Sequence, residues 1–453
     1  MELTLKKIAN ALGTTLDSDK IIKRISLDSR DIDGNTLFFA IKGERFDAHD
    51  FAQQVSESGA AALVCHKKVD VSCPVIYVDD TKTALLKLSS YYRNKFGDLI
   101  LIGLTGSVGK TTTKEMTACV MEQKYKTLKT EGNFNNEIGM PKTLFRLEED
   151  TECAVIEMGM SEFGEISALS NAAEPNCAII SNIGVSHIEN LGSRDGIFKA
   201  KLEMLEGLKK GSPLILNGDD DKLSTVKNDD FNVLFFGIEN ENCDVRAIDI
   251  KEGDLHTDFT VVCKDGKQKV TLPTVGIHNV YNALAAIAVG LCFGVTLEQS
   301  ANGLKDYVPS GMRQRIKKLG NITFIEDCYN ASPDSQRAAL NSLCTVANGR
   351  RIAVVGDMLE LGAYSETAHR TVGEYAAEKK IDMLYTLGEN SKYTADSARL
   401  GGLKNVFEFT DKQDLADALI QELKDGDTVM FKASRGMRLE EVFTFIYENN
   451  GGN

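Results

Sequence analysis

The sequence has no apolar run of the roughly 18 residues or more that a membrane-spanning helix needs. Its first residues, Met-Glu-Leu-Thr-Leu-Lys-Lys, lack the pattern of a secretory signal peptide. No internal repeat or low-complexity tract interrupts the chain. These absences argue against a membrane-spanning, secreted or repeat protein, and we expect a cytoplasmic protein without a membrane span.

Metal-binding cysteine motifs and an excess of positive charge are also missing. The ten cysteines form no Cys-x-x-Cys pair and no spacing with histidine that suits a metal, which favours buried, reduced thiols. The 52 Lys and Arg residues are outnumbered by 66 Asp and Glu residues, for a net charge of −14. This balance argues against nucleic acid as the main partner, because phosphate backbones attract a basic face. To bind an anionic ligand, a protein with this net charge would need Lys or Arg side chains, Mg²⁺ or helix N-termini at the binding site.

What the chain does contain is typical of an α/β protein, with 42% hydrophobic and 26% charged residues. Its 453 residues suggest about three domains of ~150 residues each. We predict a small N-terminal α/β domain over residues 1–97 and a central domain over 98–312 with a mostly parallel sheet of the phosphate-loop ATPase type. A C-terminal domain over 313–453, in which five strand patterns alternate with helical ones, is predicted to form a Rossmann-like doubly wound sheet.

The most informative stretch is a glycine-rich turn that follows the apolar run Leu99–Ile102 and precedes a helical pattern from about Thr112. Such a turn directs backbone N–H groups toward phosphate at the positive end of the helix dipole. Lys110 is placed to reach the β- and γ-phosphates, and the Thr111 hydroxyl to bind Mg²⁺. The standard loop has its first glycine at the position of Leu104, so this loop is shortened, with Gly106 in its place. The alternative is an ordinary glycine-rich turn.

Two more polar residues follow buried strands of the central domain. Glu157 ends the strand Ala154–Glu157, where a carboxylate beside a phosphate loop commonly holds Mg²⁺. His187 follows the strand predicted over 177–183, at the edge where open α/β sheets bind ligands, although a lone histidine there is more often structural. Between the phosphate loop and Glu157, the asparagine- and glycine-rich segment 130–141 is predicted to be an ordered loop.

Other candidates carry weaker patterns. A helix is predicted from Arg194 to about Lys210, and periodicity alone leaves its Lys201 a solvated lysine. Asn279 and Asn282 share a helix face and could read a purine edge, or Asn279 could cap the helix. In the N-terminal domain, Arg30 and Lys42 lie in polar loops and could hold an anion, with a solvated turn as the alternative.

In the C-terminal domain, polar residues end three predicted strands. Asp327 and Asp357 each end a strand, and Lys432 begins the segment Lys-Ala-Ser-Arg-Gly at the end of a third. Polar groups at one edge of a sheet predict a ligand site there.

Taken together, these motifs resemble the Mur ligases, the ATP-dependent amide-forming enzymes of peptidoglycan precursor synthesis, over essentially the whole chain. The resemblance rests on motifs that occur in the order of the family: Thr105–Thr112, Asn133–Pro141, Glu157, Ser186-His187, His278-Asn-x-x-Asn282, Arg313 and Asp327–Asn330. Within the family, three features favour the members that add D-alanyl-D-alanine to a UDP-linked muramoyl tripeptide: Asn133-x-Asn-Asn136 with Gly139 and Pro141, the segment Asp327–Asp334, and the segment Gly356–Gly362. Ser332 departs from the pattern, since the family often has asparagine there.

The resemblance implies an ATP-dependent, ADP-forming ligase that proceeds through an acyl phosphate. It implies two Mg²⁺ ions, one held by Thr111 and Glu157, the other by His187 and a carboxylated lysine at position 201. Lys110, Glu157, His187 and Lys201 would then be catalytic. It further implies a cytoplasmic, monomeric enzyme whose partners are UDP-N-acetylmuramoyl-tripeptide and D-alanyl-D-alanine.

The resemblance also implies the binding residues. Those for the nucleotide are Thr105, Gly106, Ser107, Val108, Gly109, Lys110, Thr111, Thr112, Asn279, Asn282, Arg313, Asp327, Tyr329 and Asn330. Among them, Asn282 would face adenine, Arg313 the phosphates and Asp327 the ribose. Those for the two other substrates are Ser29, Arg30, Lys42, Gly43, Asp47, Asn133, Asn135, Asn136, Asp357, Lys432, Ser434 and Arg435. Of these, Asp28–Arg30 and the loop from Gly43 to His49 would hold the UDP-sugar.

Three other functions stay open at this stage. A different Mur-type or folylpolyglutamate synthetase-like ligase would join another amino acid. A nucleotide-dependent switch or transport ATPase would hydrolyse nucleotide without ligation. An inactive scaffold would be expected to lack Lys110 or Glu157, and both are present.

Overall fold

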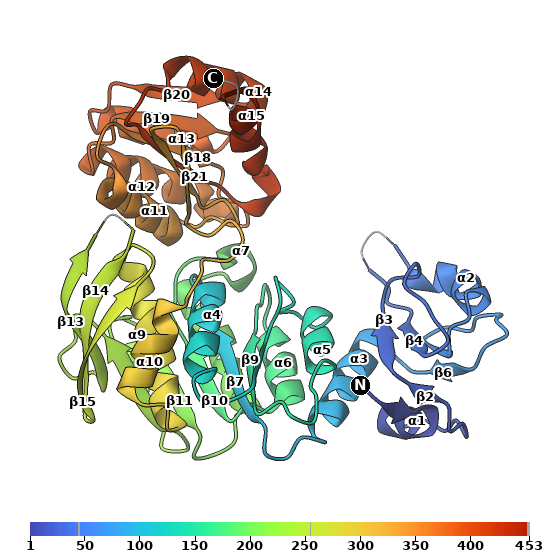
Figure 1. The fold of residues 1–453 in the computed structure, drawn as a ribbon. Coiled ribbons are helices and arrows are strands. Elements are labelled where there is room, and N and C mark those ends of the chain that lie inside the picture. Colours follow the sequence, from blue (N-terminus) through green and yellow to red (C-terminus); the bar gives the residue numbers. More distant parts are fainter. Residues whose placement is uncertain (44–45, 254, 451–453) are drawn as a thin grey trace. The chain divides into compact units, whose positions relative to one another are not determined.

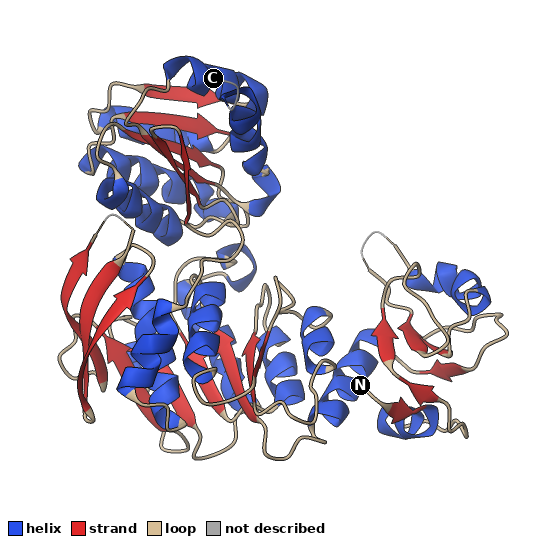
Figure 2. Cartoon of the chain, in the orientation of Figure 1, coloured by secondary structure: helices blue, strands red, loops and turns tan. Residues whose placement is uncertain are grey.

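The computed structural model describes residues 1–43, 46–253 and 255–450. The chain divides into two compact units. The first unit comprises residues 1–105, 125–178 and 202–212, and the second comprises 106–124, 179–201 and 213–453. Within the described residues, strands form sheets of two, four, nine and six members, and helices accompany the three larger sheets (Figure 2).

The N-terminal part of the first unit contains a four-stranded parallel sheet in the order β3-β4-β5-β6. Strands β4 and β5 are buried along their length, as their uninterrupted apolar sequences predict. Phe38 and Leu63 pack against Ala52 and Val55 of the neighbouring helix. The elements are β1 (Leu3–Thr4), α1 (Leu5–Leu12), β2 (Ile21–Ile22), β3 (Arg24–Ser26), β4 (Thr36–Phe39), η1 (Ala48–Phe51), α2 (Ala52–Glu57), β5 (Ala62–Cys65), β6 (Val75–Tyr77) and α3 (Thr81–Arg93).

The rest of the first unit carries three parallel strands, with β9 between β7 and β8. The buried Arg93, at the end of α3, donates through Nε to the carbonyl of Ala173 at 2.8 Å and so ties α3 to the end of α6. The elements are β7 (Ile100–Thr105), β8 (Thr127–Lys129), α5 (Gly139–Leu144), β9 (Cys153–Glu157), α6 (Glu165–Ala173) and the 3-10 turn η2 (Glu203–Glu206).

The nine-stranded sheet has the order β15-β14-β13-β12-β11-β10-β7-β9-β8. In the second unit, β12 runs parallel to both β11 and β13. Strand β14 is antiparallel to both of its neighbours, β13 and β15. The alternating apolar residues over 231–274 are typical of antiparallel strands, which fits β13, β14 and β15 but not β12. The elements are α4 (Lys110–Met121), β10 (Cys177–Ile180), α7 (Ile188–Leu191), α8 (Arg194–Leu202), β11 (Pro213–Asn217), η3 (Leu223–Thr225), β12 (Asn232–Gly237), β13 (Val245–Glu252), β14 (Thr257–Cys263), β15 (Gly266–Leu272), α9 (Ile277–Cys292) and α10 (Leu297–Lys305).

Two helix boundaries differ from the prediction. Helix α4 begins at Lys110 rather than Thr112, so the lysine of the phosphate loop is already helical. The helix predicted from Arg194 to Lys210 ends at Leu202 and continues as the 3-10 turn η2. In the first unit, the Glu203 carboxylate accepts hydrogen bonds from Gly164 N at 2.9 Å and Ser167 N at 3.3 Å. These hydrogen bonds connect Glu203 to residues that are distant in the sequence. The local pattern of apolar residues, from which the helix was predicted, does not reveal such a contact.

The C-terminal sheet of the second unit has the order β16-β17-β21-β18-β19-β20. Its strands are parallel except for β16, an antiparallel edge strand that the sequence did not predict. The elements are β16 (Arg315–Leu319), β17 (Ile322–Glu326), α11 (Pro333–Val346), β18 (Arg351–Gly356), η4 (Gly362–Tyr364), α12 (Ser365–Glu378), β19 (Met383–Leu387), α13 (Ser391–Leu400), β20 (Val406–Phe409), α14 (Lys412–Glu422), β21 (Thr428–Lys432), η5 (Arg435–Met437) and α15 (Glu440–Asn450).

Both faces of this sheet are covered by helices (Figure 1). On β18, Ala353 and Val355 face the core formed with α11, α12 and α13. Ile352 and Val354 alternate with them and face the core formed with α14 and α15. Helices α12 and α13 approach closely at Gly373, where an added Cβ would lie 2.1 Å from the carbonyl oxygen of Thr394. The doubly wound arrangement predicted for this region is therefore present.

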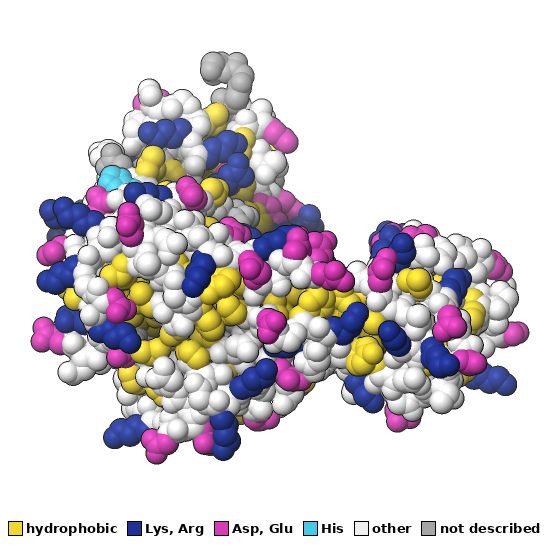
Figure 3. Space-filling view, turned by 60° about the horizontal axis from the view of Figure 1, so that its bottom comes forward, with side chains coloured by type: hydrophobic (Ala, Val, Ile, Leu, Met, Phe, Trp, Pro, Cys, Tyr) yellow, Lys and Arg dark blue, Asp and Glu magenta, His cyan; other side chains and the backbone are white. Residues whose placement is uncertain are grey.

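The surface mixes charges of both signs. Lys and Arg side chains alternate with Asp and Glu side chains over the face in Figure 3, without a large basic patch there. No helix among the described residues is long and apolar enough to cross a membrane.

A buried carboxylate provides a stability prediction for the C-terminal sheet. Asp427, only 2% exposed, accepts from Arg350 Nε at 2.8 Å and Nη2 at 2.7 Å. Arg350→Met would leave this carboxylate without its cation, and we expect a loss of about 3 kcal/mol in the free energy of unfolding. The shift of the urea midpoint measures it. Lys6→Met, which breaks the exposed pair with Asp17, is the control and should leave the midpoint unchanged. Equal midpoints for both variants would contradict the prediction.

Candidate active site

The glycine-rich turn enters α4 with the geometry of a phosphate-binding loop. Gly109 has φ of +78° directly before the helix, a backbone conformation that favours glycine. An added Cβ at this position would also lie 2.8 Å from Asn282 Oδ1. The N–H groups of Ser107 and Val108 donate to Asn182 Oδ1 at 3.1 and 2.9 Å. Asn182 thus holds the loop by presenting an oxygen to the amides that a phosphate would contact.

Lys110 lies at the first position of α4 and folds back over the loop. Its Nζ donates to the carbonyl of Gly106 at 2.8 Å and approaches that of Ser107 at 3.4 Å. The amine therefore stands beside the backbone of the turn, where an anionic ligand would meet it. Thr111 follows at the start of the helix and is buried.

The amides of Asn279 and Asn282 are committed to contacts within the protein. Asn282 Nδ2 donates to Asn279 Oδ1 at 3.2 Å, and Asn279 Nδ2 donates to Gln314 Oε1 at 2.7 Å. The Thr113 hydroxyl lies 3.0 Å from Asn282 Oδ1. These bonds link α4 through α9 to the start of β16. Both asparagines are buried, so reading an adenine would require their amides to exchange partners.

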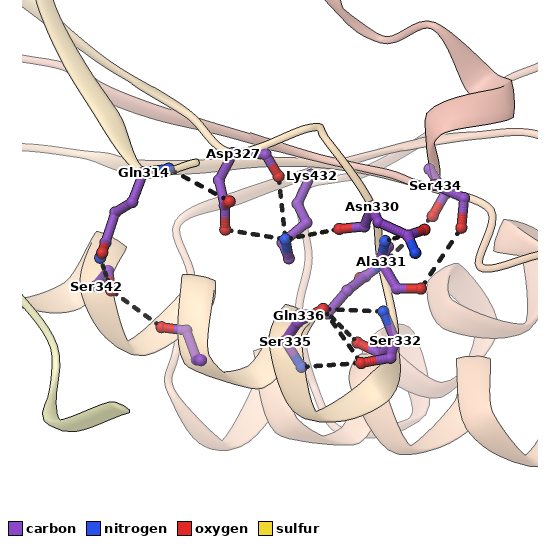
Figure 4. A network of polar contacts seen from close by, with 12 residues as sticks. Gln314, Asp327, Asn330, Ala331, Ser332, Ser335, Gln336, Ser342, Lys432 and Ser434 are labelled. Atoms are coloured by element: carbon purple, nitrogen blue, oxygen red, sulfur yellow. Dashed lines mark hydrogen bonds and ion pairs between the residues drawn. The ribbon is translucent and has the colours of Figure 1, made fainter. Parts of the chain in front are cut away.

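A second polar network lies at the ends of β17 and β21 (Figure 4). Lys432 Nζ contacts Asp327 Oδ2 at 2.9 Å and donates to the carbonyls of Asp327 and Asn330 at 3.1 and 2.9 Å. Gln314 N donates to Asp327 Oδ1 at 3.3 Å, which joins this network to the asparagine chain. Ser332, which departs from the family pattern, caps α11 by accepting from Ser335 N.

The other predicted residues of the C-terminal sheet have definite neighbours. The Arg313 guanidinium lies 3.6 Å from the centre of the Tyr329 ring, a cation–π contact. Asp357 is buried and accepts from Ser391 N and Oγ, both at 2.7 Å, so it holds the start of α13. Ser434 Oγ accepts from Leu359 N at 2.9 Å, whereas Arg435 pairs with Glu440 near the surface.

His187 has a carboxylate partner from the C-terminal sheet region of the same unit. Its Nδ1 lies 2.8 Å from Glu360 Oε2. The hydrogen bond from His187 lowers the pKa of the Glu360 carboxyl below its ordinary value. The Ser186 hydroxyl, one residue earlier, donates to the carbonyl of Ser107 at 3.3 Å. The segment that carries His187 is therefore tied directly to the phosphate loop.

Lys201 is the most unusual titratable group of the site. It is 2% exposed, and no hydrogen bond or ion pair of its amine is found in the part of the chain that the structure describes. Burial, reinforced by repulsion from Lys110, lowers the pKa of the Lys201 amine well below its ordinary value. Burial thus favours the neutral form of the amine, which is a nucleophile, and the positive charge of Lys110 would favour an anionic group at this position.

These residues suit a hard divalent cation only in combination with further ligands. Among the described residues, no cluster of three or more His, Cys, Asp or Glu side chains forms a ready metal site. Within the second unit, the Thr111 hydroxyl, the His187 imidazole and a carboxylated Lys201 would supply donors that suit Mg²⁺ once substrate oxygens and water complete the set. The burial of Lys201 without a carboxylate partner is the observation that supports such a modification.

Predicted residues of the first unit also have protein partners. Glu157, at the end of β9, is buried, and its Oε1 accepts from Asn135 Nδ2 at 2.9 Å. Asn136 Oδ1 accepts from Gly139 N at 2.8 Å at the start of α5. The Asn133 carbonyl accepts from Asn135 N at 2.7 Å. Residues 130–138 therefore form a loop, as predicted, whereas 139–141 belong to helix α5, so the loop prediction is wrong for them. Within the loop, Asn135 contacts the carboxylate proposed to hold a metal.

The residues predicted to hold the UDP-sugar lie in surface loops. Arg30 forms a bidentate ion pair with the Asp28 carboxylate, through Nε at 2.9 Å and Nη2 at 2.7 Å. Ser29 lies between them in the sequence. Asp47 accepts from His49 N at 3.0 Å and Lys67 Nζ at 2.9 Å. Lys42 and Gly43 are exposed, and residues 44–45 of the predicted loop lie outside the described residues. Arg30 would have to leave Asp28 to bind an anion.

Comparisons with known proteins place the chain in a family. The model of the Mur ligase family catalytic domain matches residues 21–92, that of the Mur ligase middle domain residues 104–290, and that of the Mur ligase glutamate ligase domain residues 312–435. A UDP-N-acetylmuramoyl-tripeptide–D-alanyl-D-alanine ligase of Bacillus subtilis is 41% identical over 98% of each chain. The chain belongs to the Mur ligase family. A protein of the same name from Escherichia coli is 36% identical over 99% of each chain.

Solved structures agree with the fold of this Mur ligase. A crystal structure of MurF from Acinetobacter baumannii superposes with a TM-score of 0.92 at 32% identity, covering 99% of each chain. MurF ligase from Thermotoga maritima in complex with ADP gives a TM-score of 0.86 at 29% identity, covering 94% of this chain and 98% of that one. The resemblance and the α/β fold expected from the sequence are both confirmed.

Three residues of this Mur ligase that contact the candidate site were not singled out from the sequence. Asn182 holds the phosphate loop, Gln314 joins two polar networks, and Glu360 pairs with His187. The sequence could have indicated two of them, because Asn182 lies at the polar end of a predicted strand and Glu360 lies within the motif Gly356–Gly362. It could not have indicated Gln314, since the role of this residue depends on the contacts of β16.

Proposed function

We propose that this chain is an ATP-dependent, ADP-forming ligase that joins D-alanyl-D-alanine to UDP-N-acetylmuramoyl-tripeptide. The observation that carries the proposal is the phosphate loop at the start of α4, in a chain that matches relatives named for this reaction along 98% of both lengths. A loop of this kind binds the tail of a nucleoside triphosphate. Ligation therefore accounts for the loop and for the similarity along the rest of the chain.

The reaction makes a carboxylate electrophilic. An oxygen of the terminal carboxylate of the tripeptide attacks the γ-phosphorus of ATP, the bond to the β-bridging oxygen breaks, and ADP leaves. The amine of D-alanyl-D-alanine then attacks the acyl carbon of the acyl phosphate. The tetrahedral intermediate expels inorganic phosphate, and the amine loses a proton. Phosphoryl transfer of this kind depends mainly on positioning and on neutralising charge.

The chain's own groups supply that positioning. The Lys110 amine and the loop amides bind the phosphates, and the start of α4 adds its dipole. Thr111 and Glu157 would hold one Mg²⁺, while His187 and a carboxylated Lys201 would hold a second. Bound Mg²⁺ offsets the repulsion between the carboxylate and the triphosphate.

The remaining roles follow the three proposed domains. Residues 1–97 would bind the UDP-sugar through Ser29, Arg30, Lys42, Gly43 and Asp47. Residues 98–312 would bind ATP, with Asn133, Asn135 and Asn136 beside the peptide and with Asn279 and Asn282 facing adenine. Residues 313–453 would bind the incoming dipeptide through Asp357, Lys432, Ser434 and Arg435, and would add Arg313, Asp327, Tyr329 and Asn330 to the nucleotide site. We further propose a monomeric, cytoplasmic enzyme without a nucleic-acid partner.

A reconstituted assay tests the proposal. Purified chain is incubated with UDP-muramoyl-tripeptide, ATP, Mg²⁺ and D-alanyl-D-alanine, and both phosphate release and product mass are measured. We expect the UDP-muramoyl-pentapeptide, with phosphate release that requires both co-substrates. Parallel assays with single amino acids and with lysine or meso-diaminopimelate at peptide position three define specificity. Ligation of a different amino acid would indicate another ligase of the family, and hydrolysis without muramoyl peptide would indicate a nucleotide switch.

A further inference from the structure

Glu360 faces His187 although nothing in the proposed reaction requires a carboxylate at position 360. The two side chains come from different sheet regions of the second unit, and Nδ1 of the histidine lies 2.8 Å from Oε2 of the glutamate. Both residues have left-handed backbones, with φ of 62° and 63°. Such conformations are uncommon for residues other than glycine and persist where surrounding contacts impose them. The surrounding contacts, rather than the local backbone preference, therefore hold His187 and Glu360 in these conformations.

The loop that carries Glu360 is fixed on both sides. Before it, Met358 N donates to His369 Nε2 at 3.0 Å, and Leu359 N donates to Ser434 Oγ at 2.9 Å. After it, Leu361 is buried in the core that α11, α12 and α13 share. The backbone at residue 360 consequently has little freedom, and its side chain is presented to the histidine from a rigid support.

A hydrogen bond to Nδ1 determines what the other ring nitrogen can do. A neutral imidazole carries one proton, and a carboxylate at Nδ1 retains that proton there because a carboxylate can only accept. Nε2 then carries the lone pair and is free to bind a metal. Histidine ligands in metal sites generally donate their second ring N–H to a carboxylate or a carbonyl in this way.

We propose that Glu360 is a positioning residue that holds His187 as the Nδ1–H tautomer and orients Nε2 toward a divalent cation. The inference rests on the proposed metal-binding role of His187. It assigns to the loop after β18 a part in building the metal site, in addition to the dipeptide-binding role proposed for the C-terminal region. Removing the carboxylate weakens the metal site without removing any ligand from it.

The first test measures the tautomer directly. Chain labelled with ¹⁵N-histidine is examined by long-range ¹H–¹⁵N correlation at about pH 8.5, above the ordinary imidazole pKa of about 6.5. The six histidines are distinguished by the signal lost in His187→Gln. We expect His187 in the Nδ1–H form, a change to the Nε2–H form in Glu360→Ala, and retention in Glu360→Gln, whose amide oxygen still accepts. An Nε2–H form in the unsubstituted chain would overturn the proposal.

The second test measures metal affinity. Mn²⁺ binding to the chain with a non-hydrolysable ATP analogue is followed by calorimetry, and we expect Glu360→Ala to bind about 10- to 100-fold more weakly. The matched control is Glu366→Ala, which removes an exposed carboxylate that pairs with Arg370 on α12. Thermal melts establish that each variant is folded. Equal Mn²⁺ affinity in Glu360→Ala and the unsubstituted chain would overturn the proposal.

The outcome is separable from that of the proposed function. If the unsubstituted chain forms the pentapeptide while tautomer and affinity are unaffected in Glu360→Ala, the positioning role is wrong and the ligase stands. If both readouts change as expected but no pentapeptide is formed, the positioning role holds and the ligase assignment is wrong.

Discussion

Lys110→Ala is expected to lower kcat/KM by roughly 10²-fold or more, because it removes a charge that stabilises the transferring phosphoryl group. The amine stands 2.8 Å from the Gly106 carbonyl, beside the N–H groups that would bind phosphate. No other residue between Thr105 and Thr112 carries a positive charge that could replace it. The measurement is phosphate release as a function of substrate concentration.

The Lys110 prediction has a matched control. Lys199→Ala removes an exposed lysine from α8 and should leave kcat/KM unchanged. Melting temperatures of both variants should stay close to that of the parent, because alanine is well tolerated at the start of a helix. A fall of less than tenfold for Lys110→Ala would count against the proposed role.

Lys201→Met should also reduce kcat/KM by roughly 10²-fold, because it removes the group proposed to bind a second metal ion. Methionine matches the volume of the lysine stem, so the core around α8 should stay packed. The variant therefore separates the chemistry of the side chain from its contribution to packing. Lys199→Ala, two residues along the same helix, is again the control.

A direct readout of the modification accompanies this prediction. Chain equilibrated with ¹³C-bicarbonate should show a carbamate resonance that is absent from Lys201→Met and present in Lys199→Ala. The physical reason is that burial favours the neutral amine, which can attack CO₂ and release a proton to form the carbamate. Wild-type chain without the resonance, under conditions where it is active, would show that Lys201 acts as an amine or only in packing.

The sequence predicted those parts of the fold that depend on local pattern. The strand before the phosphate loop, the strand ending in Glu157 and the five parallel strands of the C-terminal sheet all occur near their predicted positions. Apart from the half-exposed edge strand β20, these strands have mostly buried apolar runs, and such runs identify strands that are covered on both faces. By contrast, β16 is a charged edge strand, Arg-Ile-Lys-Lys-Leu, and has no such run.

The site was harder to predict than the fold, because its polar side chains form hydrogen bonds with residues that lie far away in the sequence. Asn279 and Asn282 share a helix face, as their spacing predicts, but their amides bind each other, Gln314 and the Thr113 hydroxyl. The burial of Lys201 could not be found from periodicity, which leaves this lysine indistinguishable from the exposed Lys199. In both cases the deciding quantity is the tertiary environment, which a local pattern does not contain.

Gly373 sets how closely α12 and α13 can approach, and both helices help to hold the loop that carries Glu360. His369 of α12 accepts from Met358 N, and Ser391 of α13 donates to Asp357. Because an added methyl group would meet the Thr394 carbonyl at 2.1 Å, any larger residue at 373 must spread the two helices. Gly373 is far in sequence from His187. Because it has no side chain, it sets the distance between two helices and thereby the position of the Glu360 carboxylate.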